Sequence, residues 1–153
     1  MLRNKAWRPR NRRGAAAVEM AITMIPLSMV VMGIIECGRL MTVQEIAVNA
    51  TREGARLAAL SGSTVGTSTS SGATEVNYRV RSYLTAAGIP TAAATVTITD
   101  LDQPSITDLT AASAGDRIQV GVSIPFSSVA LTSPWFFGNV SIQSTSVMRK
   151  EGP

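Results

Sequence analysis

The chain has 153 residues, which is enough for one modest domain and a membrane anchor. It contains no histidine and one cysteine, so the usual general base and commonest metal ligand are missing and an intramolecular disulfide is excluded. The net charge of +4 arises at the start, because the first 13 residues hold six of the 14 Lys and Arg and none of the 10 Asp and Glu. A nucleic-acid binder is not expected, since its basic stripe would lie on the folded domain and not on a short arm before an apolar segment.

An apolar segment of 21 residues, Ala15 to Ile35, follows the cations and is interrupted by one charge, at Glu19. A helix of this length spans roughly 30 Å, the thickness of a bilayer core. The residues after it, 36–40, do not form the small-residue cleavage site of a secretory signal. We therefore expect a retained transmembrane helix over residues 15–36. The excess of cations before it predicts a cytoplasmic N-terminus and a C-terminal domain outside.

Three residues in or beside this segment call for an explanation. Pro26 lacks an N–H, so we expect a kink or a loosened turn there. Cys37 is expected to pack as a small hydrophobic residue and not to act as a reactive thiol. A carboxylate costs about 2.5–3.5 kcal/mol at the bilayer centre and less near the interface, where Glu19 falls. Glu19 is either an end residue that reaches back to the headgroups or a carboxylate that awaits a positive partner.

Apolar residues continue at helical spacing after the membrane segment, which predicts an amphipathic helical extension over residues 37–60. They are Leu40, Val43, Ala47, Ala50, Gly54, Leu57 and Ala58. Within the extension, the block 52–56 has two interpretations. The favoured one is a solvated charged face with a glycine for close helix contact. The other is a partner-binding face made by Arg52, Glu53, Gly54 and Arg56.

A stretch rich in Ser, Thr and Gly predicts a linker over residues 61–73. A second helix is expected over residues 75–87, with Thr74 as its N-cap and Gly88 and Pro90 ending it. One face of this helix is expected to hold Val76, Val80, Tyr83, Leu84 and Ala87. The opposite, polar side is expected to hold Tyr78, Arg79 and Arg81.

The period then changes to two, in segments 94–100, 117–124 and 140–147. Alternation with one apolar face predicts an antiparallel sheet that is covered on one side. The expected apolar faces hold Val96 and Ile98 in the first segment and Ile118, Val120, Val122 and Ile124 in the second. The predicted fold class is therefore α+β: a long N-terminal helix whose first half spans the membrane, then a small extracytoplasmic domain (74–153) with one helix on a three- to four-stranded antiparallel sheet.

An aromatic segment, Pro134-Trp135-Phe136-Phe137-Gly138, connects the last two predicted strands. The favoured interpretation is a connection folded over the open end of the core. The alternative is an exposed patch, made by Trp135, Phe136 and Phe137, that contacts the membrane surface or another subunit.

No nucleotide-binding glycine loop, nucleophile elbow or metal-ligand spacing occurs in the sequence. Asp100, Asp102 and Asp108 are close together but lack the spacing of a calcium loop, and we expect them to be solvated turn acids. The sequence therefore predicts neither an enzyme nor a bound cofactor or metal.

Three sequence blocks carry a resemblance to a known family. The first, Arg13-Gly14-Ala15-Ala16-Ala17-Val18-Glu19-Met20-Ala21, resembles the processing site of type IV prepilin-like proteins, in which a glycine precedes the cut and a glutamate is fifth in the mature chain. Together with the second block, residues 33–39, and the third, residues 49–56, it resembles the TadE-like family. These are pseudopilins of the tight adherence (Flp pilus) system, and the resemblance covers about residues 10–60.

The resemblance implies that a prepilin peptidase in the cytoplasmic membrane cuts between Gly14 and Ala15 and removes a basic leader, residues 1–14. The new amine of Ala15 would then be the positive partner of Glu19 in a neighbouring subunit. Met20 departs from the aromatic or other apolar residue that many pilin-like chains have at this position. The implied partners are the peptidase, other pilins or pseudopilins, the pilus assembly platform and the lipids of the inner membrane.

The predicted function is therefore that of a non-catalytic minor pseudopilin that supports pilus biogenesis from the inner membrane. A single-pass anchored adhesin or binding module that never enters a pilus is the alternative. It would account for the linker and the aromatic segment but not for Gly14 and Glu19.

Overall fold

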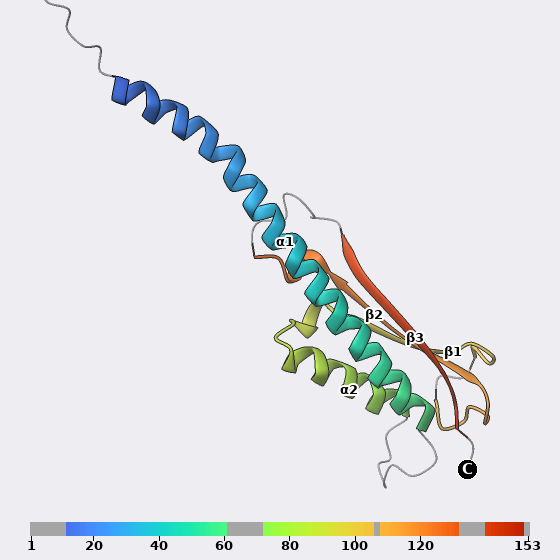
Figure 1. Cartoon of the computed structure of the whole chain (residues 1–153). Coiled ribbons are helices and arrows are strands. Elements are labelled where there is room, and N and C mark those ends of the chain that lie inside the picture. The colour runs from blue at the N-terminus through green and yellow to red at the C-terminus, as the bar shows by residue number, and fades with distance from the viewer. Residues whose placement is uncertain (1–11, 61–71, 106–107, 132–139, 152–153) are drawn as a thin grey trace, which may run out of the picture. The chain divides into compact units, whose positions relative to one another are not determined.

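The computed structural model describes residues 12–60, 72–105, 108–131 and 140–151. The chain divides into two compact units, Met1–Ile35 and Glu36–Pro153, which are considered one at a time. Helix α1, Arg12–Leu60, contributes to both units and continues without interruption through Pro26 (Figure 1).

The first unit holds the part of α1 that is long and apolar enough to cross a membrane. None of the most apolar stretch is buried within the chain. Large apolar side chains are exposed all around the helix, among them Val18, Met20, Ile22, Ile25, Leu27, Val30 and Ile34. A helix that is apolar on every side is stable only when lipid or other helices surround it, so this unit has the surface of a membrane span.

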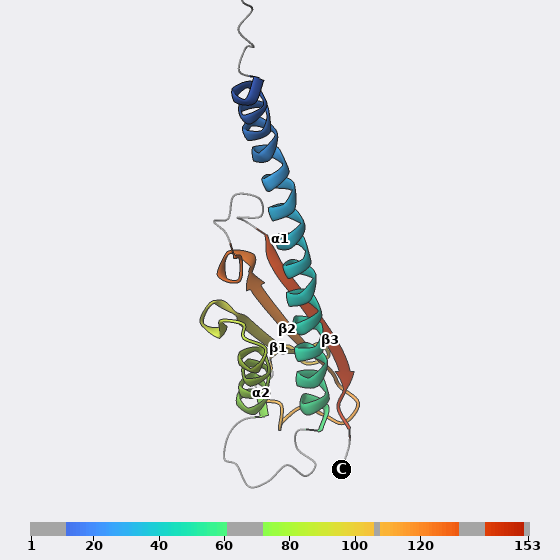
Figure 2. The ribbon, with the colours of Figure 1, turned by 60° about the vertical axis from the view of Figure 1, so that its left-hand side comes forward.

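The second unit is a two-layer α+β domain. Its elements after α1 are α2 (Gly72–Ala86), η1 (Thr91–Ala93), β1 (Thr95–Asp100), β2 (Arg117–Pro125), η2 (Phe126–Ser128) and β3 (Ser141–Arg149). The strands form one antiparallel sheet in the order β1-β2-β3, with Val96 opposite Val122 and Val122 opposite Ser144. The C-terminal half of α1 and the shorter α2 lie side by side on one face of this sheet (Figures 1 and 2).

The core lies between the two helices and the central strand. Ile118, Val120, Val122 and Ile124 of β2 are all buried, because alternate side chains of a strand point to the same face. Against them α2 places Val76, Val80 and Leu84, and α1 places mainly small residues: Ala47, Ala50, Ala55 and Ala58. Small side chains let the α1 backbone approach the sheet closely. The opposite face of the sheet is polar, with Thr95, Thr97, Thr99, Gln143 and Thr145 directed to solvent on it.

The predicted fold class is confirmed: a long apolar helix, a second helix and a three-stranded antiparallel sheet make a small α+β domain. Helix α2 begins at Gly72, so Thr74 lies inside its first turn and is not the N-cap. Tyr83 and Ala87 are exposed, because α2 contacts the core through the single row Val76, Val80 and Leu84. Cys37 is exposed and does not pack within the chain, because it points about 100° around α1 from its buried neighbour Glu36.

Candidate subunit-contact surfaces

The proposed cleavage site and Glu19 lie on the exposed first part of α1. The helix has already begun at Arg12, and Gly14 and Ala15 are both exposed. A Cβ added at Gly14 would meet no atom within 4 Å, so the backbone there is open to a binding partner. Glu19 is exposed one turn further along, and Thr23 donates its hydroxyl to the Glu19 carbonyl at 3.1 Å, which leaves the carboxylate group out of that contact.

Two charged residues join α1 to the connection after β2, at the point where the apolar segment ends. Glu36 is 2% exposed, and its Oε1 accepts a hydrogen bond from the backbone N–H of Leu131 at 3.1 Å. Nε of Arg39, one turn later, donates to the carbonyl of Val129. Both residues belong to the second block of the family resemblance. The contacts therefore attach the start of the β2–β3 connection to the first turn of α1 after the apolar segment.

We predict that Glu36→Ala destabilises the second unit by about 1–3 kcal/mol, because it removes the buried carboxylate that accepts the backbone N–H of Leu131. Thermal unfolding of the full chain in detergent micelles, followed by circular dichroism, measures the effect. Glu45→Ala is the matched control, since Glu45 is an exposed carboxylate on the same helix. Equal melting temperatures for the two variants would contradict the structural role of Glu36.

Some residues of the third block, 49–56, are buried in the core and others are exposed on the surface. Thr51 is fully buried, and its hydroxyl is 3.0 Å from the Oγ of Ser144 on β3. Gly54 is also buried, and a Cβ there would lie 2.6 Å from Cγ2 of Val80 and 3.2 Å from Cγ1 of Val120. At Gly54, α1 therefore approaches α2 and β2 too closely for a side chain, which is the close contact that the sequence favours for this glycine.

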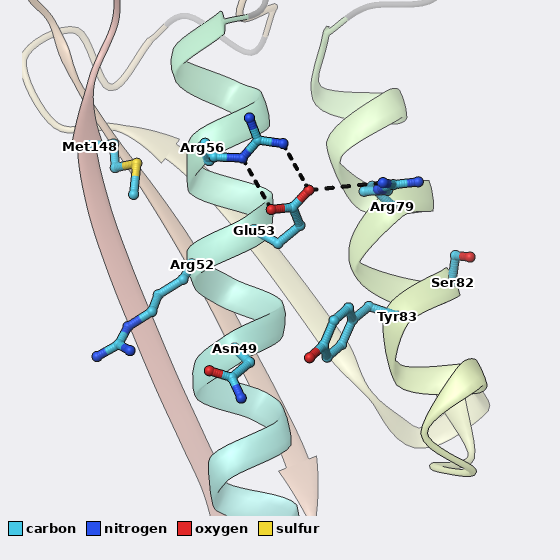
Figure 3. A pocket seen from close by; sticks show the side chains of 8 residues that line it. All are labelled: Asn49, Arg52, Glu53, Arg56, Arg79, Ser82, Tyr83 and Met148. Carbon is cyan, nitrogen blue, oxygen red and sulfur yellow. Dashed lines mark hydrogen bonds and ion pairs between the residues drawn. The ribbon is translucent and has the colours of Figure 1, made fainter.

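The charged residues of the same block line a groove whose lining residues come from α1, α2 and the end of β3 (Figure 3). The groove has a volume of about 480 Å³. Its lining residues are Asn49, Arg52, Glu53, Arg56, Arg79, Ser82, Tyr83 and Met148. Nε and Nη2 of Arg56 each donate to one carboxylate oxygen of Glu53, both at 3.1 Å. Nη2 of Arg79 on α2 lies 3.9 Å from the same carboxylate, so Glu53 stands between the two helices.

Electrostatics at this groove favour the ionised form of Glu53. The hydrogen bond from Arg56 is the main cause that lowers the pKa of Glu53. Burial opposes it as the second largest effect, and the charges of Arg56 and Arg79 lower the pKa further. The same hydrogen bond raises the pKa of Arg56. Because the two arginines are exposed and Glu53 is only partly buried, the pairs contribute little to stability. Their consequence is a fixed arrangement of charge on the surface.

Three further predictions concern acids and aromatic residues. Asp100 is buried and is not a solvated acid: its Oδ1 accepts the backbone N–H groups of Asp102 and Gln103, so it closes the turn after β1. The side chain of Asp102 forms an ion pair with Arg117 at 2.8 Å.

No three His, Cys, Asp or Glu side chains in the described part of the chain are arranged to hold a metal. Trp135, Phe136 and Phe137 lie outside the described residues.

Sequence patterns alone miss several contact residues. Arg79 is expected only to face outward, and its approach to Glu53 depends on how α2 packs beside α1. Arg81, also expected to face outward, binds the carbonyls of Thr91 and Ala94 and stabilises the turn after α2. For Glu36 and Arg39, the only sign of a role in the sequence is that both lie in a block that resembles a known family. That block does not indicate which groups they bind.

Comparison with known proteins gives a family match in about the first third of the chain. Residues 14–56 match the model of a family described as TadE-like protein. No curated protein and no solved structure matches the chain. The match begins at Gly14 and ends at Arg56. It therefore includes Glu19, the two residues that bind the connection after β2 (Glu36 and Arg39), and the charged residues of α1 that line the groove. The predicted resemblance is therefore confirmed for this segment: residues 14–56 are similar to the TadE-like family.

Proposed function

We propose that the protein is a minor pseudopilin of a tight adherence pilus system, held in the inner membrane by α1 with its second unit outside. The family match over residues 14–56 is the observation that supports the proposal, because TadE-like proteins are associated with such pilus systems. The exposed apolar surface of the first unit is suited to both of the environments that a pseudopilin meets, lipid before assembly and other helices after it.

In this proposal a prepilin peptidase removes residues 1–14 at the cytoplasmic side. Cutting after Gly14 creates an α-amine on Ala15 and leaves Glu19 four residues, or one helical turn, further along. An amine and a carboxylate attract strongly in a medium of low dielectric, and either one alone is costly there. Pairing of Ala15 in one subunit with Glu19 in the next would satisfy both groups and set the register of the packed helices.

Processing can be tested directly on the protein extracted from membranes of its native host. Mass spectrometry is expected to find Ala15 as the N-terminal residue and a mass reduced by that of residues 1–14. Replacement of Gly14 by leucine, which puts a bulky side chain beside the cut, is expected to leave the leader in place. An intact N-terminus on the unaltered chain, in cells with an active prepilin peptidase, would contradict the proposal.

An anchored adhesin or binding module is the second candidate, supported by the small domain with its polar sheet face. That function needs no cut after Gly14 and no carboxylate at Glu19. Localisation separates the two functions. A pseudopilin co-purifies with sheared pili or with the assembly machinery. An adhesin remains in the membrane fraction, and pili form normally in cells that lack it.

A further inference from the structure

The groove beside Glu53 holds more positive than negative charge. Three guanidinium groups, those of Arg52, Arg56 and Arg79, line it together with one carboxylate, that of Glu53. Glu53 occupies the fork of Arg56 through two hydrogen bonds and has only a long contact with Arg79. Arg52 extends to the other side of α1, away from that carboxylate (Figure 3), and forms no ion pair within the described ranges. The groove therefore has an excess of two positive charges.

Its lining suits a peptide side chain better than an isolated ion. The ring of Tyr83, which is 40% exposed, and the thioether of Met148 offer apolar contact surface beside the arginines. Asn49 and Ser82 add neutral hydrogen-bonding groups. Because a guanidinium presents its N–H groups in a planar fork that matches a carboxylate, the chemistry selects Asp or Glu side chains.

The separation along α1 between the groove and the apolar segment favours a protein over lipid headgroups as the occupant. Arg52 lies 16 residues after Glu36 in one continuous helix, which is about 24 Å along the helix axis. The headgroup layer extends only about 5–8 Å beyond the hydrocarbon core. The groove is thus placed for another protein outside the membrane.

A second copy of this chain is a poor occupant. If Ala15 of one copy pairs with Glu19 of the next, the two helices are staggered by four residues. Arg52 and Arg56 are also four residues apart, so the stagger would bring Arg56 of one copy level with Arg52 of its neighbour. Like charges so placed repel, which favours a partner of different sequence.

We propose that this groove is a docking site for a neighbouring subunit of different sequence, which inserts paired Asp or Glu side chains toward Arg52 and Arg79. The proposal rests on the proposed pseudopilin function and adds to it the chemistry of the contact. It also makes Arg52 the residue that determines the choice of partner, since Arg56 is already held by Glu53.

A photo-crosslinking experiment on the full chain in its native host tests this contact. Benzoylphenylalanine replaces Tyr83 in the groove or, as the matched control, Tyr78, an exposed tyrosine of the same helix outside the groove. Irradiation is expected to join position 83, and not position 78, to a segment with at least two carboxylates, which peptide sequencing identifies. Equal yields from both positions, a cross-link to lipid, or a cross-link to a second copy would overturn the proposal.

Charge variants then test the role of Arg52. Arg52→Glu is expected to lower the cross-link yield at position 83 by at least about tenfold, and Arg52→Gln by less, because reversal adds repulsion to the lost attraction. Arg149→Glu makes the same change in net charge at an exposed site outside the groove and is expected to leave the yield unchanged. Equal losses for Arg52→Glu and Arg149→Glu would refute a specific contact. Unfolding curves of each variant show that the domain is intact.

The N-terminal residue of the same samples separates the two proposals. If Ala15 is the N-terminus and position 83 gives no cross-link, the groove proposal fails and the pseudopilin proposal stands. If the leader is retained and the cross-link still depends on Arg52, the docking site stands and the processing proposal fails.

Discussion

Glu19→Ala is expected to abolish incorporation of the protein into pili while leaving its insertion into the membrane intact. The substitution removes a carboxylate from an otherwise apolar segment, so the cost of placing the segment in lipid falls. Assembly is affected in the opposite direction, because the α-amine of Ala15 in the adjacent subunit loses its partner. An uncompensated buried charge costs about 3–5 kcal/mol, which is enough to exclude a subunit from a packed helical array.

The measurement is a comparison of sheared pili with membrane fractions by immunoblotting. Glu19→Asp keeps the charge and should retain part of the incorporation, whereas Glu45→Ala removes an exposed carboxylate outside the membrane segment and should have no effect. Normal incorporation of the Glu19→Ala protein would show that Glu19 only reaches toward the headgroups. Loss of the variant from the membrane would show that the residue acts in insertion.

Gly54→Leu is expected to have the largest effect on folding. Even the first side-chain atom would lie 2.6 Å from Cγ2 of Val80, closer than van der Waals contact allows. Val80 cannot turn away, because a β-branched side chain in a helix has one strongly preferred rotamer. Val120, at 3.2 Å, closes the other side. We expect a loss of about 3 kcal/mol in the free energy of unfolding, since overpacking of a full core moves the backbone.

Thermal unfolding of the full chain in micelles should show this loss as a decrease in Tm of roughly 10 °C. Gly38→Leu is the matched control: Gly38 lies in the same helix and the same unit, and a Cβ there would meet nothing within 4 Å. Leucine is the better helix former, so the control should be neutral or stabilised by up to about 1 kcal/mol. Similar Tm values for both variants would mean that α1 and α2 do not pack through Gly54.

Much of the fold could be predicted from local patterns. The alternation of Ile118, Val120, Val122 and Ile124 predicts a strand with one buried face, and all four side chains are buried. The helical spacing of Val43, Ala47, Ala50 and Ala58 predicts the side of α1 that packs on the domain. Periodicity of this kind succeeds because it depends on the geometry of a single element.

Local patterns fail to predict burial where it depends on how one element packs against its neighbours. Tyr83 fits the apolar face of α2 by spacing, yet it lines the groove because the core accepts only one row of that helix. Asp100 resembles an ordinary turn acid, yet the turn folds over it and buries it. In both cases the burial of the side chain depends on the surface that packs against it, and the local sequence carries no information about that surface.

The sequence by itself determined the length of the apolar segment, the order of two helices and three strands, and the spacing between Gly14 and Glu19. Composition and period are sufficient for these features because each depends on neighbouring residues. Only the tertiary structure decided that Glu36 and Arg39 bind the connection after β2, that Gly54 packs closely against Val80 and Val120, and that Arg79 lines one groove with Arg52 and Arg56. These contacts join residues that are up to 95 positions apart in the chain, and folding alone brings them together.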